Sequence, residues 1–242
     1  MKRRSSPLSS PRQPILGIRS NFLGAPVDPG TWGRARVAVL PVPFEQTVSY
    51  GKGTSRGPSA ILGASAYVEF YDEETGRDVM RDVGIATLPP FRTPKKGKAA
   101  VDAIAARAGQ LLSTGKFLLT LGGEHTISQA LVRAHIERHP DLSILQIDAH
   151  SDLRESYQGS PYSHASVMAR VCEFVDPKRV VQVGIRAQRP SQAVEGGDEE
   201  VVVLEVAEDA QVEDQQSHEA DPAPALGLSA PQVGTGSVIR RG

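Results

Sequence analysis

The chain has 242 residues, of which 39% are hydrophobic, and such a chain can build one large α/β domain around a core. Its formal net charge of -1 gives no reason to expect a nucleic acid or an anionic membrane as a partner. The single cysteine excludes an internal disulfide, and no apolar run approaches the roughly 20 residues that span a bilayer. We therefore expect a cytoplasmic protein.

Composition divides the chain into three zones. Residues 1–14 combine basic residues with serines and prolines, and they predict a disordered leader because they cannot bury enough apolar surface to become ordered. Residues 15–187 alternate apolar runs with helical patterns and predict the folded domain. Residues 188–242 contain no aromatic residue and are rich in acids as far as Asp221. They predict an acidic tail without a core of its own, and disorder is one interpretation of it.

Strands and helices alternate along the middle zone. In chain order, the pattern predicts a strand at 36–40, a helix from about Ser59, a helix at 99–112, a strand at 117–121, a helix from Thr126 to about 139, a strand at 142–148, a helix from about 165 and a strand at 179–185. Strands separated by helices of this length predict right-handed crossovers and a parallel sheet covered on both faces. The expected fold is therefore a doubly wound α/β domain.

Three ionisable side chains stand at every second position just after the strand expected at 142–148. Asp148, His150 and Asp152 would leave the same side of an extended backbone and point at one spot. Two carboxylates and an imidazole gathered at one point are costly unless a cation lies between them. The DAHSD segment therefore predicts a metal site.

His125 follows the end of the other central strand, expected at 117–121. The carboxyl ends of parallel strands share one edge of a sheet, so His125 joins the other three residues if the two strands are neighbours. A lone histidine after a glycine pair is more often structural, and a D-x-H pattern arises by chance. Their occurrence at matching strand ends favours the metal site. We interpret Glu124 as a carboxylate close to a helix N-terminus.

The segments that carry this chemistry resemble a known family. LGGEHTIS at residues 121–128 and IDAHSDLRESYQGSPYSHASVMARV at residues 147–171 are similar to the manganese-dependent ureohydrolases of the arginase and agmatinase family. Residues 49–76 resemble the agmatinase branch in particular. The resemblance implies an arginase-like, three-layer α/β/α fold with a mainly parallel sheet. It also implies a small guanidino substrate, namely agmatine hydrolysed to putrescine and urea in polyamine biosynthesis, and homo-oligomers.

The same resemblance implies a role for each site residue. His125 and Asp152 would bind one manganese ion, His150 the second, and Asp148 would bridge the two. Two such ions lower the pKa of a shared water toward neutrality, which makes a nucleophile available against the guanidinium carbon. His164 resembles the family's further active-site histidine and would shuttle a proton. Its alternative role is to cap the helix expected from about residue 165.

The last zone departs from the family pattern. Ureohydrolases complete their site with a later S-x-D-x-D motif, which residues 188–242 lack. Residues 201–206 predict one more strand, but Glu208 and Asp209 after it would point to opposite sides of an extended chain. Residues 220–227 keep an Asp-Pro pair and a glycine without the paired aspartates. We therefore expect a fold and a metal site that are incomplete in their C-terminal part.

Two origins fit this departure: a change of reading frame or an early stop near Gln188, and a genuine short relative. Two functions also stay open. The first is an enzyme of the agmatinase type. The second is a metal-binding or structural remnant without catalysis, because four protein ligands are few for two metal ions.

Overall fold

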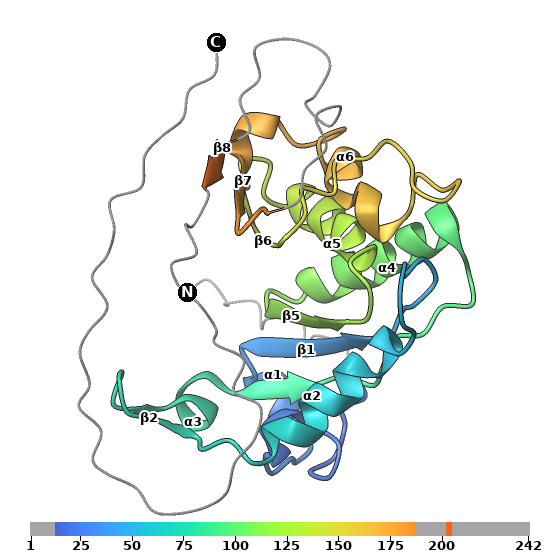
Figure 1. Cartoon of the computed structure of the whole chain (residues 1–242). Helices are drawn as coiled ribbons and strands as arrows, with labels where there is room; N and C mark the ends of the chain where they lie inside the picture. The colour runs from blue at the N-terminus through green and yellow to red at the C-terminus, as the bar shows by residue number, and fades with distance from the viewer. Residues whose placement is uncertain (1–12, 187–201, 205–242) are drawn as a thin grey trace, which may run out of the picture.

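The computed structural model describes residues 13–186 and 202–204, which are coloured in Figure 1. The leader expected at 1–14 lies outside the described residues except for its last two positions. The tail expected at 188–242 lies outside them except for 202–204. Within the described part of the chain, no helix has the length and apolar character to cross a membrane.

The first sheet contains three parallel strands in the order β4-β1-β5. They are β1 (Val37–Val42), β4 (Ile85–Thr87) and β5 (Phe117–Gly122). The central strand β1 has the sequence VAVLPV, and a nearly continuous apolar run is typical of a strand buried on both faces. Its last five residues are indeed all buried.

The second sheet has the order β6-β7-β8 and is also parallel. It consists of β6 (Ile144–Ile147), β7 (Val180–Val183) and β8 (Val202–Leu204). The strand expected at 201–206 is therefore present as β8. A short antiparallel hairpin of β2 (Tyr71–Asp72) and β3 (Arg77–Asp78) stands apart from both sheets and was not predicted.

The described part of the chain contains six α-helices, of which the first precedes β1 and the others lie between strands: α1 (Thr31–Arg34), α2 (Gly57–Ser65), α3 (Val79–Val83), α4 (Gly97–Leu112), α5 (Ile127–Ile136) and α6 (Val167–Val171). The longest, α4, buries Ala100, Ile104, Ala108 and Leu111, which follow the helical spacing of three to four residues. It ends shortly before Gly115, whose φ of 74° suits a residue without a Cβ.

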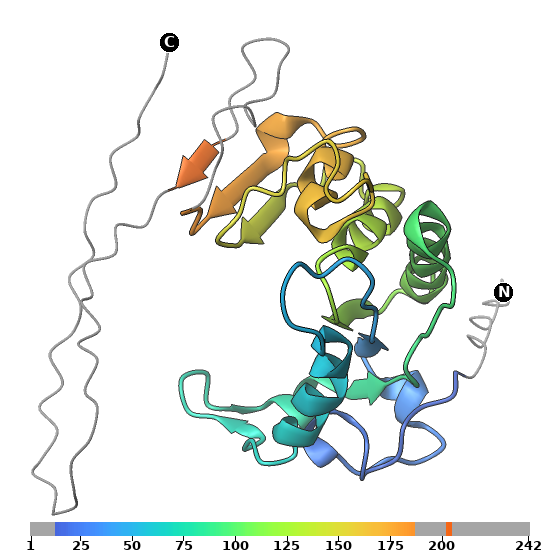
Figure 2. The ribbon, with the colours of Figure 1, turned by 45° about the vertical axis from the view of Figure 1, so that its right-hand side comes forward.

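Helices cover both faces of the first sheet. Figure 2 shows α2 and α4 on opposite sides of it, and Figure 1 shows that α4, α5 and α6 follow one another along one side of the molecule. The first apolar cluster packs β1 residues such as Leu40 against Ile104 of α4 and Ala130 of α5. A second cluster packs Met168 of α6 against the second sheet. The expected three-layer α/β/α fold with parallel strands is therefore confirmed.

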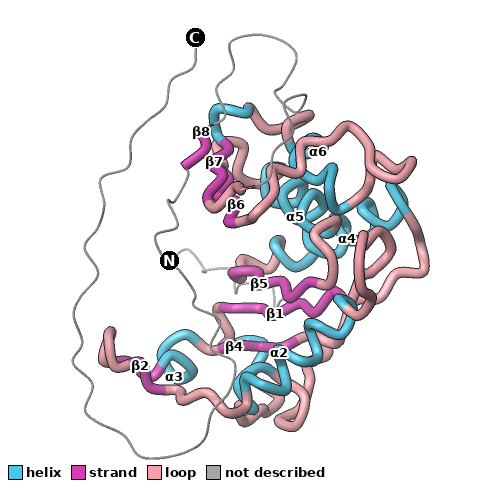
Figure 3. The backbone as a smooth tube through the Cα atoms, viewed as in Figure 1, coloured by secondary structure: helices cyan, strands magenta, loops and turns pink. Residues whose placement is uncertain are grey.

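The strands do not form the single sheet expected from the sequence. In the residues that the structure describes, β5 pairs only with β1 and β6 pairs only with β7, and Figure 3 shows the two sheets as separate groups. The helix layer joins the sheets instead, because α5 contributes to both apolar clusters. Single apolar side chains of β5 and β6 remain exposed: Phe117 at the start of β5 is 69% exposed, and Ile147 at the end of β6 is 80% exposed.

Candidate metal centre

A tight crossing of two chain segments fixes the position of His125. The backbone N–H groups of Gly123 and Glu124 donate to the carbonyls of Val42 and Phe44, over 3.1 and 2.9 Å. A Cβ on Gly123 would lie 2.0 Å from the carbonyl oxygen of Phe44, so only glycine fits there. His125 therefore leaves the end of β5 in a defined direction just before α5 begins.

The loop after β6 carries the other candidate ligands in a strained conformation. Asp152 has a φ of 51°, which costs a residue with a Cβ on the order of 1 to 3 kcal/mol. Its carbonyl accepts hydrogen bonds from the backbone N–H groups of Met168 and Ala169, at 3.0 and 3.2 Å. These two bonds tie the loop to the start of α6, and they hold Asp152 in this conformation.

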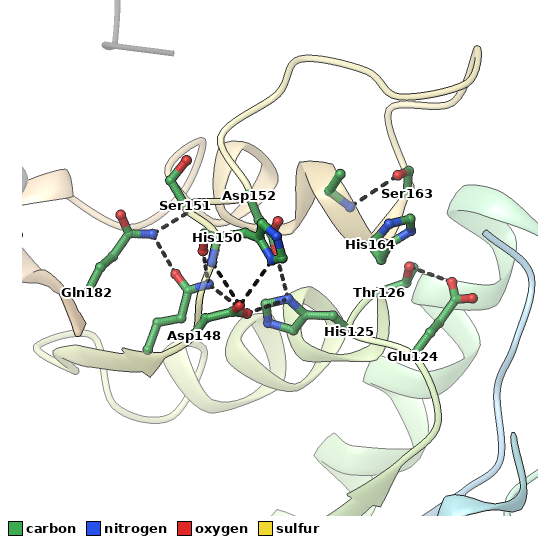
Figure 4. A network of polar contacts seen from close by, with 12 residues as sticks. Glu124, His125, Thr126, Asp148, His150, Ser151, Asp152, Ser163, His164 and Gln182 are labelled. Carbon is green, nitrogen blue, oxygen red and sulfur yellow. Dashed lines mark hydrogen bonds and ion pairs between the residues drawn. The ribbon is translucent and has the colours of Figure 1, made fainter. Parts of the chain in front are cut away.

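The structure brings His125, Asp148 and Asp152 together, although they come from two different sheets (Figure 4). The Nδ1 atom of His125 lies 2.7 Å from Oδ2 of Asp152 and 3.5 Å from Oδ2 of Asp148. One possible ligand atom from each residue lies within 4.8 Å of the others. The Asp152 side chain is only 10% exposed, so this group of charges is shielded from bulk water.

His150 stands outside this three-residue group. Its side chain is 63% exposed, and its Nδ1 atom lies 3.7 Å from Oδ1 of Asp148. The extended backbone expected across residues 148–152 is not observed, because β6 ends at Ile147 and Asp152 has a positive φ. The Asp148 carboxylate nevertheless lies between the two histidines: one oxygen faces His125 and the other faces His150.

A pair of buried glutamines supports the loop, and sequence analysis did not identify it. Gln182 on β7 donates through Nε2 to Oε1 of Gln146 on β6 and, over 2.8 Å, to the carbonyl of Ser151. Gln146 in turn donates to Oδ2 of Asp148 at 3.3 Å and to the carbonyl of His150 at 3.2 Å. The available signal was one polar residue inside each apolar strand, ILQI and VVQV, because a buried amide requires partners.

His164 lies close to the metal ligands but in a separate set of contacts. Its Nδ1 and Nε2 atoms lie 3.2 and 3.0 Å from the hydroxyls of Thr47 and Ser49. Ser163, not His164, caps the helical turn that follows, since its side chain accepts from the N–H of Ala165. The alternative role of His164 as a helix cap is therefore wrong.

Two expectations for α5 need correction, namely its cap and its end. Thr126 is the N-cap residue of α5, but its hydroxyl makes no cap hydrogen bond and donates to Glu124 instead. The helix ends at Ile136, before the residue 139 that Pro140 suggested. Glu124 lies beside the N-terminus of α5 as expected, because its carboxylate accepts from the hydroxyl of the N-cap residue Thr126. The same carboxylate also accepts from Gln46 and Thr47 in the segment after β1.

A cavity of about 300 Å³ lies between the candidate metal ligands and His164. Its lining includes Ser49, His150, Asp152, Tyr157 and His164. Two carboxylates and an imidazole are the ligand types that suit a divalent ion such as Mn²⁺. The three clustered residues therefore fit one such ion, and Asp148 and His150 offer further donor atoms beside it.

Comparison with known proteins agrees with this arrangement. A model of the arginase family matches residues 35–220, and the chain therefore belongs to the arginase family. The N(1)-aminopropylagmatine ureohydrolase of Synechocystis sp. is 39% identical over 163 residues, which cover 65% of this chain and 53% of that protein. The agmatinase of Bacillus anthracis is 37% identical over 157 residues, which cover 63% of this chain and 53% of that protein.

Solved structures show the same likeness. The agmatine ureohydrolase of Thermoplasma volcanium superposes with a TM-score of 0.60 and 30% sequence identity, covering 72% of this chain and 55% of that chain. The proclavaminate amidinohydrolase of Streptomyces clavuligerus has a TM-score of 0.60 and 26% identity, covering 74% of this chain and 58% of that chain. This chain spans about half the length of the curated relatives that it matches.

Proposed function

We propose that this chain carries the metal-dependent hydrolase chemistry of a ureohydrolase and acts on a small guanidino compound. One observation carries the proposal. Three ligand atoms from His125, Asp148 and Asp152 lie within 4.8 Å of one another, and Asp152 lines the same cavity as His164. A shielded group of metal ligands next to an imidazole is the arrangement that hydrolysis of a poor electrophile requires.

The proposed roles follow from the ligand types and their positions. His125 and Asp152 would hold one manganese ion, His150 would hold a second, and Asp148 would bridge them with one oxygen toward each histidine. Bound manganese would supply a water of lowered pKa at neutral pH. His164 would hold the proton that the leaving amine requires, at a ring nitrogen facing the cavity.

Agmatine is the substrate that we propose, with putrescine and urea as products. Its support is the similarity to the agmatinase of Bacillus anthracis, and N(1)-aminopropylagmatine is the competing substrate by similarity to the Synechocystis protein. A role in polyamine biosynthesis would follow from either substrate. A cytoplasmic location is supported by the single cysteine, and assembly into homo-oligomers by the apolar side chains exposed on β5 and β6.

Urea release from agmatine tests this function directly. We expect turnover of the full chain with added Mn²⁺ and none after chelation of the metal. Asp152→Asn should lower turnover by more than the roughly 10- to 100-fold typical of partners outside the metal's ligand sphere. Asp141→Asn is the matched control, because its side chain is 98% exposed and should leave turnover unchanged.

A measurement of Mn²⁺ binding distinguishes a chain that binds metal without catalysis from a chain that has no metal centre. Binding without turnover on either guanidino substrate would favour the alternative, a metal-binding remnant without catalysis. Absence of Mn²⁺ binding at millimolar metal would rule out the metal centre itself.

A further inference from the structure

Glu124 is a buried carboxylate that the metal centre does not use. It is 3% exposed, and Figure 4 shows its side chain turned toward Thr126 and away from Asp148. Its Oε2 atom accepts from the backbone N–H groups of Gln46 and Thr47, at 2.6 and 2.7 Å. Its Oε1 atom accepts from the hydroxyls of Thr126 and Thr47, at 2.6 and 2.8 Å. These four donors are the set that an ionised carboxylate takes, since it can only accept.

Because Glu124 can only accept hydrogen bonds, it fixes the direction in which the Thr47 hydroxyl points, and Thr47 in turn contacts His164. A threonine hydroxyl has one hydrogen, and in Thr47 that hydrogen is donated to Glu124. The Thr47 oxygen must therefore accept from its other neighbours. Two of those neighbours belong to His164: its backbone N–H at 3.0 Å and its Nδ1 atom at 3.2 Å. The third is the hydroxyl of Thr126 at 3.4 Å, whose own hydrogen is donated to Glu124 at 2.6 Å. This network assigns the hydrogen of the imidazole to Nδ1.

In this tautomer the other ring nitrogen of His164, Nε2, carries no hydrogen. A neutral imidazole carries one N–H, so Nε2 of His164 keeps its lone pair. That atom lies 3.0 Å from the hydroxyl of Ser49, which lines the cavity together with His164 and Asp152. Ser49 also lies 3.3 Å from the hydroxyl of Tyr157, but either hydroxyl can donate in that longer, uncharged contact, so Ser49 can donate to Nε2. The lone pair of Nε2 is thereby held at the cavity lining, where it can take up a proton.

We propose that Glu124 is a positioning residue that sets the tautomer of His164 through the hydroxyl of Thr47. Within the described residues, Glu124 is not part of the cavity lining and has no hydrogen bond to His164, so Thr47 is the residue that links the two. The use of this tautomer in proton transfer rests on the proposed function. The tautomer itself does not depend on turnover, so it is measured independently.

Nitrogen-15 NMR of the imidazole rings tests the proposal in the full chain without added metal. The measurement is made near pH 8, where an ordinary histidine is neutral, and His164→Gln assigns the signals. We expect the Nδ1–H form of His164 in the unsubstituted protein. In Glu124→Gln the new amide can donate to Thr47, which turns the Thr47 hydrogen toward the ring. The Nε2–H form should then become the major one.

Three further variants keep the test decisive. Thr47→Val removes the acceptor and should also abolish the preference for Nδ1–H, whereas Thr47→Ser keeps the hydroxyl and should preserve it. Thr126→Val is the matched control, because it removes a hydroxyl that donates to the same Glu124 oxygen and makes no hydrogen bond to His164 within the described residues, while Thr47 keeps its own bond to Glu124. It should leave the tautomer unchanged.

Two results would overturn the inference: a predominant Nε2–H form in the unsubstituted protein, and an unchanged tautomer in Thr47→Val. Far-ultraviolet circular dichroism verifies that each variant is folded. If the tautomer behaves as expected and no urea is released, the proposed function fails and the positioning role of Glu124 stands.

Discussion

At the scale of single residues, buried amides determine the conformation of the metal-binding loop. Gln182 is 1% exposed and Gln146 is 7% exposed, and both sit within otherwise apolar strands. A buried amide donor without an acceptor costs about 1 to 3 kcal/mol, so the loop conformation that gives both amide nitrogens their acceptors is favoured. That conformation is the one in which Gln146 donates to Asp148.

Replacement of Gln182 by leucine should therefore weaken metal binding without abolishing the fold. Gln182→Leu has a similar volume but loses the donors to Gln146 and to the carbonyl of Ser151. We expect Mn²⁺ affinity to fall by roughly 10- to 100-fold, as for other groups that orient metal ligands. Titration followed by the electron paramagnetic resonance of free Mn²⁺ measures it. Gln110→Leu on the exposed face of α4 is the control, and equal affinities in both variants would refute the role of Gln182.

At the scale of elements, two glutamates hold the segment between β1 and α2 that carries Thr47 and Ser49. Glu124 binds its first part, and Glu45 binds its last part by accepting from the N–H groups of Ser55 at 2.8 Å and Gly53 at 3.0 Å. These N–H groups, Ser55 foremost, lower the pKa of Glu45 from 4.5 to about 2.

The lowered pKa of Glu45 predicts a pH-dependent contribution to stability. A carboxylate whose pKa falls on folding stabilises the folded state above its unfolded pKa, and this contribution is lost as the pH falls toward the folded value. Glu45→Gln should therefore lower the melting temperature most above pH 4.5, and the difference should close as the pH falls toward about 2. Circular dichroism melts across this range measure it. Glu137→Gln on the exposed end of α5 is the control, and a gap that is independent of pH would contradict the assignment.

At the scale of the whole molecule, the helix layer joins two sheets that share no hydrogen bonds within the described residues. Val132 and Ile136 of α5 pack against the cluster around α6, while Ala130 and Ala134 of the same helix belong to the cluster around α4. The metal ligands come from both halves, so their geometry depends on this layer.

We therefore expect the two clusters to unfold together. Met168→Ala, in the second cluster, should destabilise the protein by about 2 to 5 kcal/mol because Met168 is only 3% exposed. The loss should appear in the fluorescence of Trp32, the single tryptophan, which belongs to the first cluster. Urea denaturation measures it, with Arg138→Ala as an exposed control. A Trp32 transition unchanged by Met168→Ala would mean that the two halves unfold independently.

Much of the local structure could be predicted from hydrophobic patterns. The helix expected at 99–112 is α4 at Gly97–Leu112, and the strand expected at 117–121 is β5 at Phe117–Gly122. The conformation of the loop residues was harder to predict, because it depends on contacts with residues far away in the chain. The positive φ of Asp152 is one example, since α6 holds the carbonyl of that residue.

The sequence by itself determined the alternation of strands and helices, the family, and the strand ends at which His125 and Asp148 would lie. These features are local: they follow from side-chain periodicity and from short motifs. Only the tertiary structure decided that the strands form two sheets, that His150 stands aside, and that Glu124 reaches His164 through Thr47. These features join residues up to 117 positions apart, and only the packing of the helix layer and the crossing beside Gly123 bring such residues into contact.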